Sequence, residues 1–344
     1  MVGAGLVGIR HIDAIKRAEN IELAAIVDTS DEARQGACET QVNFYQSLQE
    51  MFAEVVPDGV LIATPTIMHV EQGLQCIEAG CPVLVEKPIA TSAIDSNELV
   101  RRAKDQNVPL LVGHHRRYNP LIQQAYALIQ AGEIGRIRSV QGTCWLYKPD
   151  DYFETAPWRT KIGAGPISVN LVHDVDLMRY LIGDVIRVQA ATSINARGYE
   201  NEDVGAAVLT FANGVVGTIS VSDSVVSPWS WELTARENPC YPATNQSCLL
   251  VGGSHGSLSI PDLTLWTNQG HRSWWNAISA TASPRNFSDP LVNQVEHFAE
   301  VIAGRASPVV SGLEGMKTLQ VIEAIQISAE RGQAVDIVAT EDVS

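Results

Sequence analysis

The sequence has few cysteines, and none of them is paired in a metal-binding or redox motif. Six cysteines stand at positions 38, 76, 81, 144, 240 and 248, and no two of them form Cys-x-x-Cys. Disulfide scaffolds and structural zinc sites depend on such pairs. We therefore predict reduced thiols in a cytoplasmic protein, and no metal site.

Long apolar runs and an excess of basic residues are also missing. No apolar run approaches the roughly 18 residues that a membrane-spanning helix needs, and the first residues are glycine-rich, which is not a secretory pattern. The 344 residues include 39 acidic and 24 basic ones, for a net charge of −15. Because nucleic acids and anionic membranes attract basic surfaces, we expect neither as a partner.

What is present begins with glycines in dinucleotide-binding spacing. In "MVGAGLVGIRH", Gly3, Gly5 and Gly8 fit G-x-G-x-x-G, and Ile9, Ile12 and Ile15 follow at helical spacing. The first glycine permits a tight turn, the second lets the backbone approach a pyrophosphate, and the third lets helix and strand pack closely. We expect this turn, with Leu6 and Val7 at the start of the helix, to bind the pyrophosphate.

The cofactor preference is predicted from the end of the next apolar run. "ELAAIVD" ends at Asp28, twenty residues after Gly8. A carboxylate at this point accepts hydrogen bonds from ribose hydroxyls and repels a 2′-phosphate. We therefore expect NAD as the cofactor, with NADP less favoured.

The first strand of this layout is unusually short. Only Met1 and Val2 precede Gly3, whereas the strand before such a turn usually spans several residues. We expect that the protein begins further upstream, the alternative being a fold that tolerates a very short central strand.

Apolar runs and helical segments alternate up to residue 117. Strands are expected at 58–65, 81–88 and 108–115, and helices at 67–80 and 92–107. This alternation predicts an α/β, Rossmann-type, doubly wound parallel sheet over residues 1–117. Ligands of such sheets bind beyond the carboxyl ends of the strands. The side chains expected there are Thr64, Pro65, Glu86, Lys87, His114 and His115.

Residues 118–344 predict a second domain, of α+β class, with an open and mainly antiparallel sheet. Several β-rich runs follow one another, and Asn213-Gly214 suits a hairpin turn. Helices expected at 168–182, 290–303 and 312–331 would cover part of one face of this sheet. We expect the other face to form a homodimer or homotetramer interface.

Three motifs together resemble the Gfo/Idh/MocA family of oxidoreductases: "GAGLVG", "ATPTIMH" and "VEKPIA". The resemblance covers essentially the whole chain and includes "WR" at 158–159 and the segment "GAGPISVNLVHDVDLMRYLIG". It implies an NAD(P)-dependent dehydrogenase that acts on a sugar, an inositol or a related polyol. The cofactor-binding residues that motif and resemblance together indicate are Gly3, Gly5, Leu6, Val7, Gly8, Asp28, Thr64, Pro65, His69, Glu86, Lys87, Trp158 and Arg159.

The resemblance also implies the catalytic residues, with one departure. Lys87 and His173 match the family's acid–base groups, and catalysis is expected in a cleft between the two domains. The family usually has an aspartate four residues before the histidine, where this chain has Val169. We expect Lys87, His115, Tyr118, Asn170, His173 and Asp174 to bind the substrate.

Two other functions remain open from the residues alone. The missing aspartate is compatible with a non-catalytic, dinucleotide-binding regulator. A single proton-donating histidine would also serve a reductase of a C=C or C=N bond.

Overall fold

The computed structural model describes residues 1–268 and 270–338, which fold into two compact units. The first unit comprises residues 1–118 and Ser288–Leu319, and the second comprises residues 119–287 with the described residues from Gln320 onward. The sequence predicts the boundary after residue 117, with residues 288–319 in the second domain. The structure assigns that segment to the first unit.

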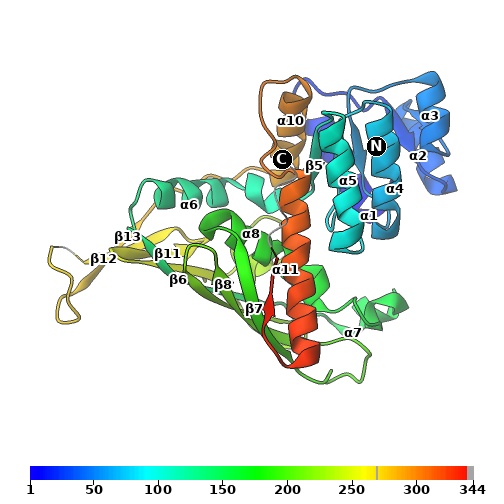
Figure 1. Ribbon diagram of the computed structural model, residues 1–344. Helices are drawn as coiled ribbons and strands as arrows, with labels where there is room; N and C mark the ends of the chain where they lie inside the picture. Colours follow the sequence, from blue (N-terminus) through cyan, green and yellow to red (C-terminus); the bar gives the residue numbers. More distant parts are fainter. Residues whose placement is uncertain (269, 339–344) are drawn as a thin grey trace. The chain divides into compact units, whose positions relative to one another are not determined.

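The first unit is an α/β layer structure, and its fold class is as predicted (Figure 1). Its strands are β1 (Ala25–Val27), β2 (Asn43–Tyr45), β3 (Val60–Ile62), β4 (Val83–Val85) and β5 (Leu110–Val112). Its helices are α1 (Leu6–Arg17), α2 (Asp31–Thr40), α3 (Leu48–Glu54), α4 (His69–Glu78), α5 (Ala93–Asp105), α10 (Pro290–Ile302) and the first part of α11 (Gly312–Arg331), with 3-10 turns η1 (Thr66–Met68) and η2 (His115–Tyr118).

Val2 stands at the centre of the parallel sheet. It forms bridges to Val27 of β1 on one side and to Ile62 of β3 on the other. β2 pairs with β1, and β4 and β5 continue from β3, all in parallel. Val2 therefore joins the two groups of strands, and the turn that begins at Gly3 leaves from the middle of the sheet.

Local sequence explains where several helices begin. The hydroxyl oxygens of Ser30, Ser47 and Ser92 accept hydrogen bonds from backbone amides in the first turns of α2, α3 and α5, as N-cap serines do. Ser92 thus begins the helix that the sequence predicts at 92–107. The strands β3, β4 and β5 are apolar and fully buried, as expected of a sheet covered on both faces.

The buried face of α1 differs from the predicted apolar stripe. Ile9 is 60% exposed, and the buried residues of the helix are Gly8, His11, Ala14 and Ile15. A histidine therefore occupies a core position of the helix that follows the glycine-rich turn.

Helix α10, which the sequence predicts, has an apolar stripe that packs within the first unit. Leu291, Val295 and Phe298 share a buried cluster with Leu61, Leu84 and Leu111 of the parallel sheet. The expectation that residues 290–303 cover the second sheet was therefore wrong. An amphipathic stripe shows which face is buried, but it does not identify the surface against which that face packs.

The second unit is built on a large and mainly antiparallel sheet. Its strands are β6 (Ile137–Trp145), β7 (Val185–Thr192), β8 (Val204–Phe211), β9 (Val216–Ser222), β10 (Leu249–Gly253), β11 (Gly256–Ile260), β12 (Thr264–Asn268), β13 (Ile278–Ala282) and β14 (Val335–Asp336). Its helical elements are α6 (Pro120–Gln130), α7 (Asp150–Glu154), η3 (Pro157–Thr160), η4 (Ile167–Leu171), α8 (Val172–Ile182), α9 (Trp231–Thr234) and the remainder of α11.

Among the described residues the strand order is β13-β12-β11-β10-β6-β9-β8-β7-β14. Only the β6–β9 pair in this order is parallel. The predicted Asn213-Gly214 turn lies between β8 and β9, with Gly214 at φ +82°. Residues of α6, α8 and the second part of α11 join one face of the sheet in a common core, whereas the other face carries exposed residues such as Leu250 and Trp266.

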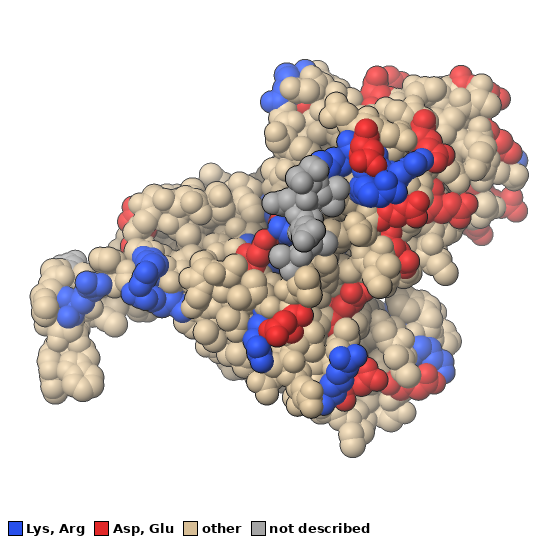
Figure 2. Space-filling view, viewed as in Figure 1, with Lys and Arg blue, Asp and Glu red and all other residues tan. Residues whose placement is uncertain are grey.

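Charge and apolar length set simple limits on the described surface. Figure 2 shows acidic side chains gathered over the first unit around α2 to α5, in keeping with the net charge of −15. No helix in the described ranges is long and apolar enough to cross a membrane.

Candidate active site

The glycine-rich turn has the packing that its three glycines predict. A Cβ on Gly3, at φ +82°, would lie 2.8 Å from the carbonyl oxygen of Ala63, and a Cβ on Gly8 would lie 2.0 Å from the carbonyl oxygen of Gly3. Gly5 differs, because a Cβ there would meet no atom within 4 Å. The first and third glycines therefore permit close packing inside the protein, while Gly5 faces open space into which a ligand's phosphates fit.

The amino-terminal end of α1 adjoins this open space. Its N-cap is Gly5, which offers no side-chain cap, and the first turn contains no acidic residue. Leu6 is 80% exposed and Val7 is 44% exposed. Backbone amides at an uncapped helix start attract an anion through hydrogen bonding and the helix dipole.

Asp28 follows β1 and closes the same turn from the other side. Its carboxylate accepts hydrogen bonds from the amides of Ala4 (2.7 Å) and Ser30 (2.8 Å). Partial burial would by itself raise the pKa of Asp28, but these amide hydrogen bonds outweigh it and hold the pKa below its ordinary value. Asp28 is therefore an ionised carboxylate that can accept hydrogen bonds from ribose hydroxyls and repel a phosphate.

A cavity of about 470 Å³ extends from the turn along the sheet edge. Its lining includes Gly3, Gly5, Asp28, Thr64 and Pro65, which were all predicted from the sequence. This volume is in the range of small-molecule sites. The open Gly5, the uncapped helix and the carboxylate together fit a dinucleotide.

His69 lies inside the protein and does not line the cavity. It is 1% exposed, and its Nδ1 and Nε2 lie 2.9 Å from the carbonyl oxygens of Pro88 and Thr64. Desolvation by burial lowers the pKa of His69, against the raising effect of these two carbonyl contacts. His69 therefore connects the segments that carry Thr64 and Pro88.

Glu86 is likewise buried, whereas Lys87 beside it is half-buried. One carboxylate oxygen of Glu86 lies 2.6 Å from Nε2 of His11, and the other accepts from the backbone amide of Lys87 at 2.9 Å. Sequence reasoning missed His11. In the sequence, His11 stands three residues after Gly8, which places it on the same helix face as that glycine. This position could have indicated that His11 is buried.

His115 and Tyr118 belong to the turn η2 after β5. His115 is half-buried, and its charge acts on Glu86. Tyr118 is 6% exposed, and its ring packs against His297 of α10 at a centroid distance of 5.3 Å. The structure thus places Tyr118 in the interior of the first unit, where its ring contacts α10.

Trp158 and Arg159 lie in η3 of the second unit. Trp158 is 59% exposed. Arg159 donates to the carbonyl oxygen of Tyr152 at 2.7 Å, and its guanidinium lies over the Tyr152 ring. Arg159 is therefore anchored locally, while the Trp158 ring is available to a ligand.

The remaining predicted residues of the second unit surround the start of α8. Asn170 is half-buried in the π-helical turn η4, and His173 and Asp174 are buried in the first turn of α8. Such π turns are frequent at functional sites. Asn170 Oδ1 has no hydrogen-bond partner in the described part of the chain, which suits an acceptor for a substrate hydroxyl.

Glu202 is a second residue that the sequence analysis missed. Its carboxylate accepts from the amide of Ile167 at 3.0 Å, at the start of η4. A Cβ on Gly165 would lie 2.2 Å from this carboxylate. Burial raises the pKa of Glu202. The residue fixes the turn that carries Asn170, and no sequence motif marks it.

The structure thus brings together two sets of predicted residues, one in each unit. The first set is the glycine-rich turn with Asp28, Thr64, Pro65 and the pair Glu86–Lys87, and the second is Asn170, His173 and Asp174. Across the described ranges, no group of three or more His, Cys, Asp or Glu side chains could hold a metal ion.

Comparison with known families agrees with this geometry. Residues 1–114 match the family described as "Oxidoreductase family, NAD-binding Rossmann fold", and residues 122–259 match the "GFO/IDH/MocA C-terminal domain". Together the two matches cover most of the chain.

Among characterised relatives, the chain is 26% identical over 359 residues to D-apiose dehydrogenase of Paraburkholderia graminis, covering 99% of this chain and 90% of that protein. It is 26% identical over 295 residues to scyllo-inositol 2-dehydrogenase (NAD(+)) of Bacillus subtilis, covering 81% of this chain and 78% of that protein.

Solved structures show the same architecture. The WlbA dehydrogenase of Bordetella pertussis, in complex with NADH and UDP-GlcNAcA, has a TM-score of 0.78 at 28% identity, covering 98% of this chain and 97% of that one. An oxidoreductase of Agrobacterium radiobacter, in complex with NAD+, L-tartaric acid and magnesium, has a TM-score of 0.83 at 22% identity, with coverage of 98% and 97%.

Proposed function

Because the chain belongs to the Gfo/Idh/MocA family of NAD-binding oxidoreductases, we propose that it transfers hydride between NAD and a secondary alcohol or ketone of a sugar, inositol or related polyol. The observation that carries this proposal is the shared sheet edge. Val2, β3 and β4 are parallel neighbours. The glycine-rich turn and Lys87 therefore leave the sheet at the same edge.

Lys87 is the proposed acid–base group of the first unit. Bound NAD⁺ would accept the hydride from the carbon that carries the hydroxyl. Oxidation also requires the hydroxyl proton to leave, and the Lys87 amine takes it up; the ammonium returns it in the reverse direction. The buried Glu86 carboxylate next to the ammonium keeps Lys87 in place.

His173 is the proposed acid–base group of the second unit, with Asn170 and Asp174 as hydrogen-bond partners of the substrate. The buried position of His173 at the start of α8 and the π turn before it support this assignment. His115, Tyr118, Trp158 and Arg159 remain proposed contacts. Exposure favours Trp158 as the member that touches a ligand.

A turnover assay tests the proposal. The purified protein is incubated with NAD⁺ or NADP⁺ and a panel of inositols, aldoses, glycosides and sugar acids, while nicotinamide absorbance is followed. Turnover with NAD⁺ on one substrate group is expected, with a ketone as product. Cofactor binding without turnover on any member of the panel would favour a non-catalytic regulator.

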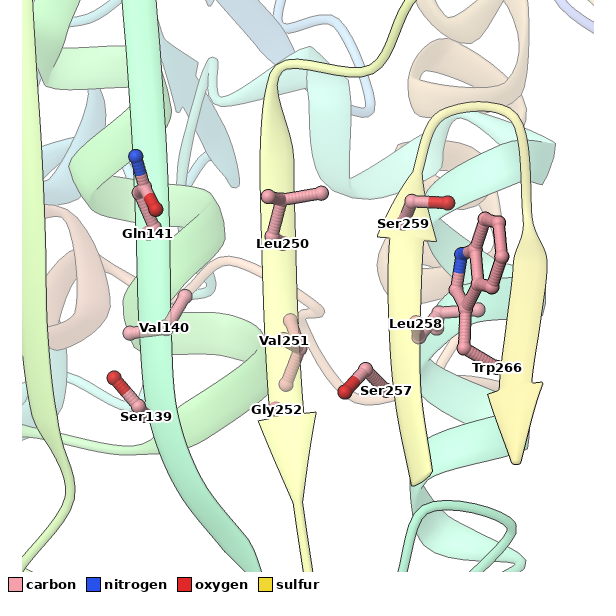
Figure 3. Close-up of a pocket in the computed structure, with 10 residues that line it drawn as sticks. All are labelled: Ser139, Val140, Gln141, Leu250, Val251, Gly252, Ser257, Leu258, Ser259 and Trp266. Atoms are coloured by element: carbon pink, nitrogen blue, oxygen red, sulfur yellow. The ribbon is translucent and has the colours of Figure 1, made fainter. Parts of the chain in front are cut away.

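Assembly through the outer face of the second sheet belongs to the same proposal. A hollow of about 310 Å³ lies on this face. Figure 3 labels residues that line it, among which Gln141, Leu250 and Trp266 come from three strands. A second hollow of about 500 Å³ adjoins it at Gln141 and is lined mainly by small residues. Half-exposed apolar side chains on a flat sheet favour burial against a second copy, so we propose a homodimer or homotetramer. None of the six cysteines, all of them in the described ranges, forms a disulfide, which fits a reducing, cytoplasmic compartment.

A further inference from the structure

His11 is buried at a position where packing alone does not require a histidine. It is 0% exposed in α1 and packs beneath the end of β4. A buried polar ring is costly unless its nitrogens are hydrogen-bonded. Nε2 bonds Glu86, while Nδ1 has no partner in the described part of the chain. The single bond of this histidine is therefore its bond to Glu86.

The Glu86 carboxylate that His11 holds has a hydrogen-bond partner at each oxygen and lies close to Gly113. Oε1 lies 2.6 Å from His11, and Oε2 accepts from the amide of Lys87. A Cβ on Gly113 would lie 2.9 Å from the carboxyl carbon, so only glycine leaves room for it there. An ionised carboxylate only accepts hydrogen bonds, which requires the proton to be on Nε2 of His11.

The charges around Glu86 favour its ionised form. Burial, the largest influence, would by itself raise the pKa of Glu86. The hydrogen bond from His11 and the positive charges of His11, Lys87 and His115 outweigh burial and lower the pKa to about 2. His69 lies close enough to interact electrostatically with Glu86 as well. Among these side chains, His11 is the one that hydrogen-bonds Glu86. Loss of His11 would therefore leave the buried Glu86 carboxylate poorly stabilised.

We propose that His11 is a positioning residue of the reaction: by holding the Glu86 carboxylate it fixes the backbone of Lys87 and the negative charge beside the Lys87 ammonium. This inference rests on the proposed role of Lys87 in hydroxyl proton transfer. His11 acts through Glu86 and touches neither the substrate nor the nicotinamide.

The direct test is the titration of Lys87 itself. The chain has six lysines, so carbon-13 reductive methylation gives few NMR signals, and Lys87→Arg identifies the one from Lys87. In His11→Leu, Glu86 loses this donor, so its carboxylate is no longer held beside the Lys87 ammonium. We expect the Lys87 titration midpoint to fall by about one pH unit.

A rescuing variant and a double mutant distinguish the positioning role of His11 from a purely structural role in the fold. In His11→Gln the amide nitrogen stands in for Nε2, so the Lys87 midpoint should return to the wild-type value. In a Glu86→Gln background, His11→Leu should have no further effect. His271→Leu, at an exposed histidine, is the control. Should His11→Leu prove insoluble, His11→Asn replaces it, because its amide is too short to reach Glu86.

Activity gives a second and separate readout. We expect kcat of His11→Leu to fall by about tenfold or more with NADH affinity within about twofold of wild type, and His11→Gln to recover most of the loss. An unchanged Lys87 titration in His11→Leu, or additive effects with Glu86→Gln, would overturn the role of His11. A wild-type enzyme that turns over no member of the panel would instead contradict the proposed function, and the titration would still decide the role of His11.

Discussion

At the scale of single residues, Lys87 and the glycine-rich turn leave the parallel sheet of the first unit at the same edge. Lys87 is only half-buried, while Glu86 before it is buried and ionised. The Lys87 side chain is thus partly accessible to a ligand, and its backbone amide is fixed by the Glu86 carboxylate. This division of roles predicts that Lys87 and the cofactor turn can be perturbed separately.

Lys87→Ala should abolish most turnover and leave cofactor binding intact. Loss of a positioned acid–base group typically costs about 10²- to 10⁴-fold in rate, whereas the turn at Gly3 to Gly8 is untouched. Steady-state kinetics and NADH fluorescence titration measure the two effects. Lys104→Ala, at an exposed lysine of α5, is the control. A fully active Lys87→Ala enzyme would remove Lys87 from the mechanism.

Asp28→Ala should weaken the preference for NAD over NADP. The ionised carboxylate favours ribose hydroxyls and repels a 2′-phosphate, so its loss should shift the ratio of kcat/KM for the two cofactors by about tenfold. Parallel assays with both cofactors measure this ratio. Glu32→Ala, an exposed acidic residue of α2, should leave it unchanged, and an unaltered ratio in Asp28→Ala would contradict the ribose assignment.

The residues that could be predicted from sequence are those in motifs with fixed spacing. Gly3, Gly8 and Asp28 lie as predicted because the turn geometry itself requires them. His11 and Glu202 were missed for a physical reason: each acts on a group distant in sequence, Glu86 and Ile167 respectively. Such pairings depend on the fold: the position of His11 three residues after Gly8 indicates its buried helix face, but it does not identify Glu86 as its partner.

At the scale of elements, hydrophobic periodicity predicted where a helix lies better than it predicted the surface against which that helix packs. The helix at 290–302 was expected, but it packs against the parallel sheet. The π turn before α8 was not expected, since its wider hydrogen bonding has no sequence signature comparable to the helical repeat. The type of each element could thus be predicted from the sequence. The surface that a helix packs against and the irregular π turn could not.

The packing of α10 gives a stability prediction. Phe298 is 6% exposed and packs in the core of the first unit, so Phe298→Ala should destabilise that unit by about 3–5 kcal/mol. Denaturant unfolding followed by circular dichroism measures the loss. Phe287→Ala makes the same substitution at a residue that is 58% exposed and should have little effect. Equal losses in the two variants would show that α10 is not part of this core.

At the scale of the whole molecule, the outer face of the second sheet determines the proposed assembly. Leu250 is 46% exposed on this face, and Leu250→Arg would place a charge in the proposed interface without disturbing the core. We expect light scattering to show a smaller assembly than wild type. Ile94→Arg, at an 85% exposed residue of α5, should keep the wild-type mass. If Leu250→Arg also retains the wild-type mass, the interface lies elsewhere.

The first unit is interrupted in sequence, since residues 288–319 complete a core that begins at Met1. During synthesis on the ribosome, the strands β3, β4 and β5 emerge before α10, which packs against them. The strands of the second unit up to β13 emerge before that helix. The cofactor-binding unit is therefore begun before the sheet of the second unit is translated and completed only after β13.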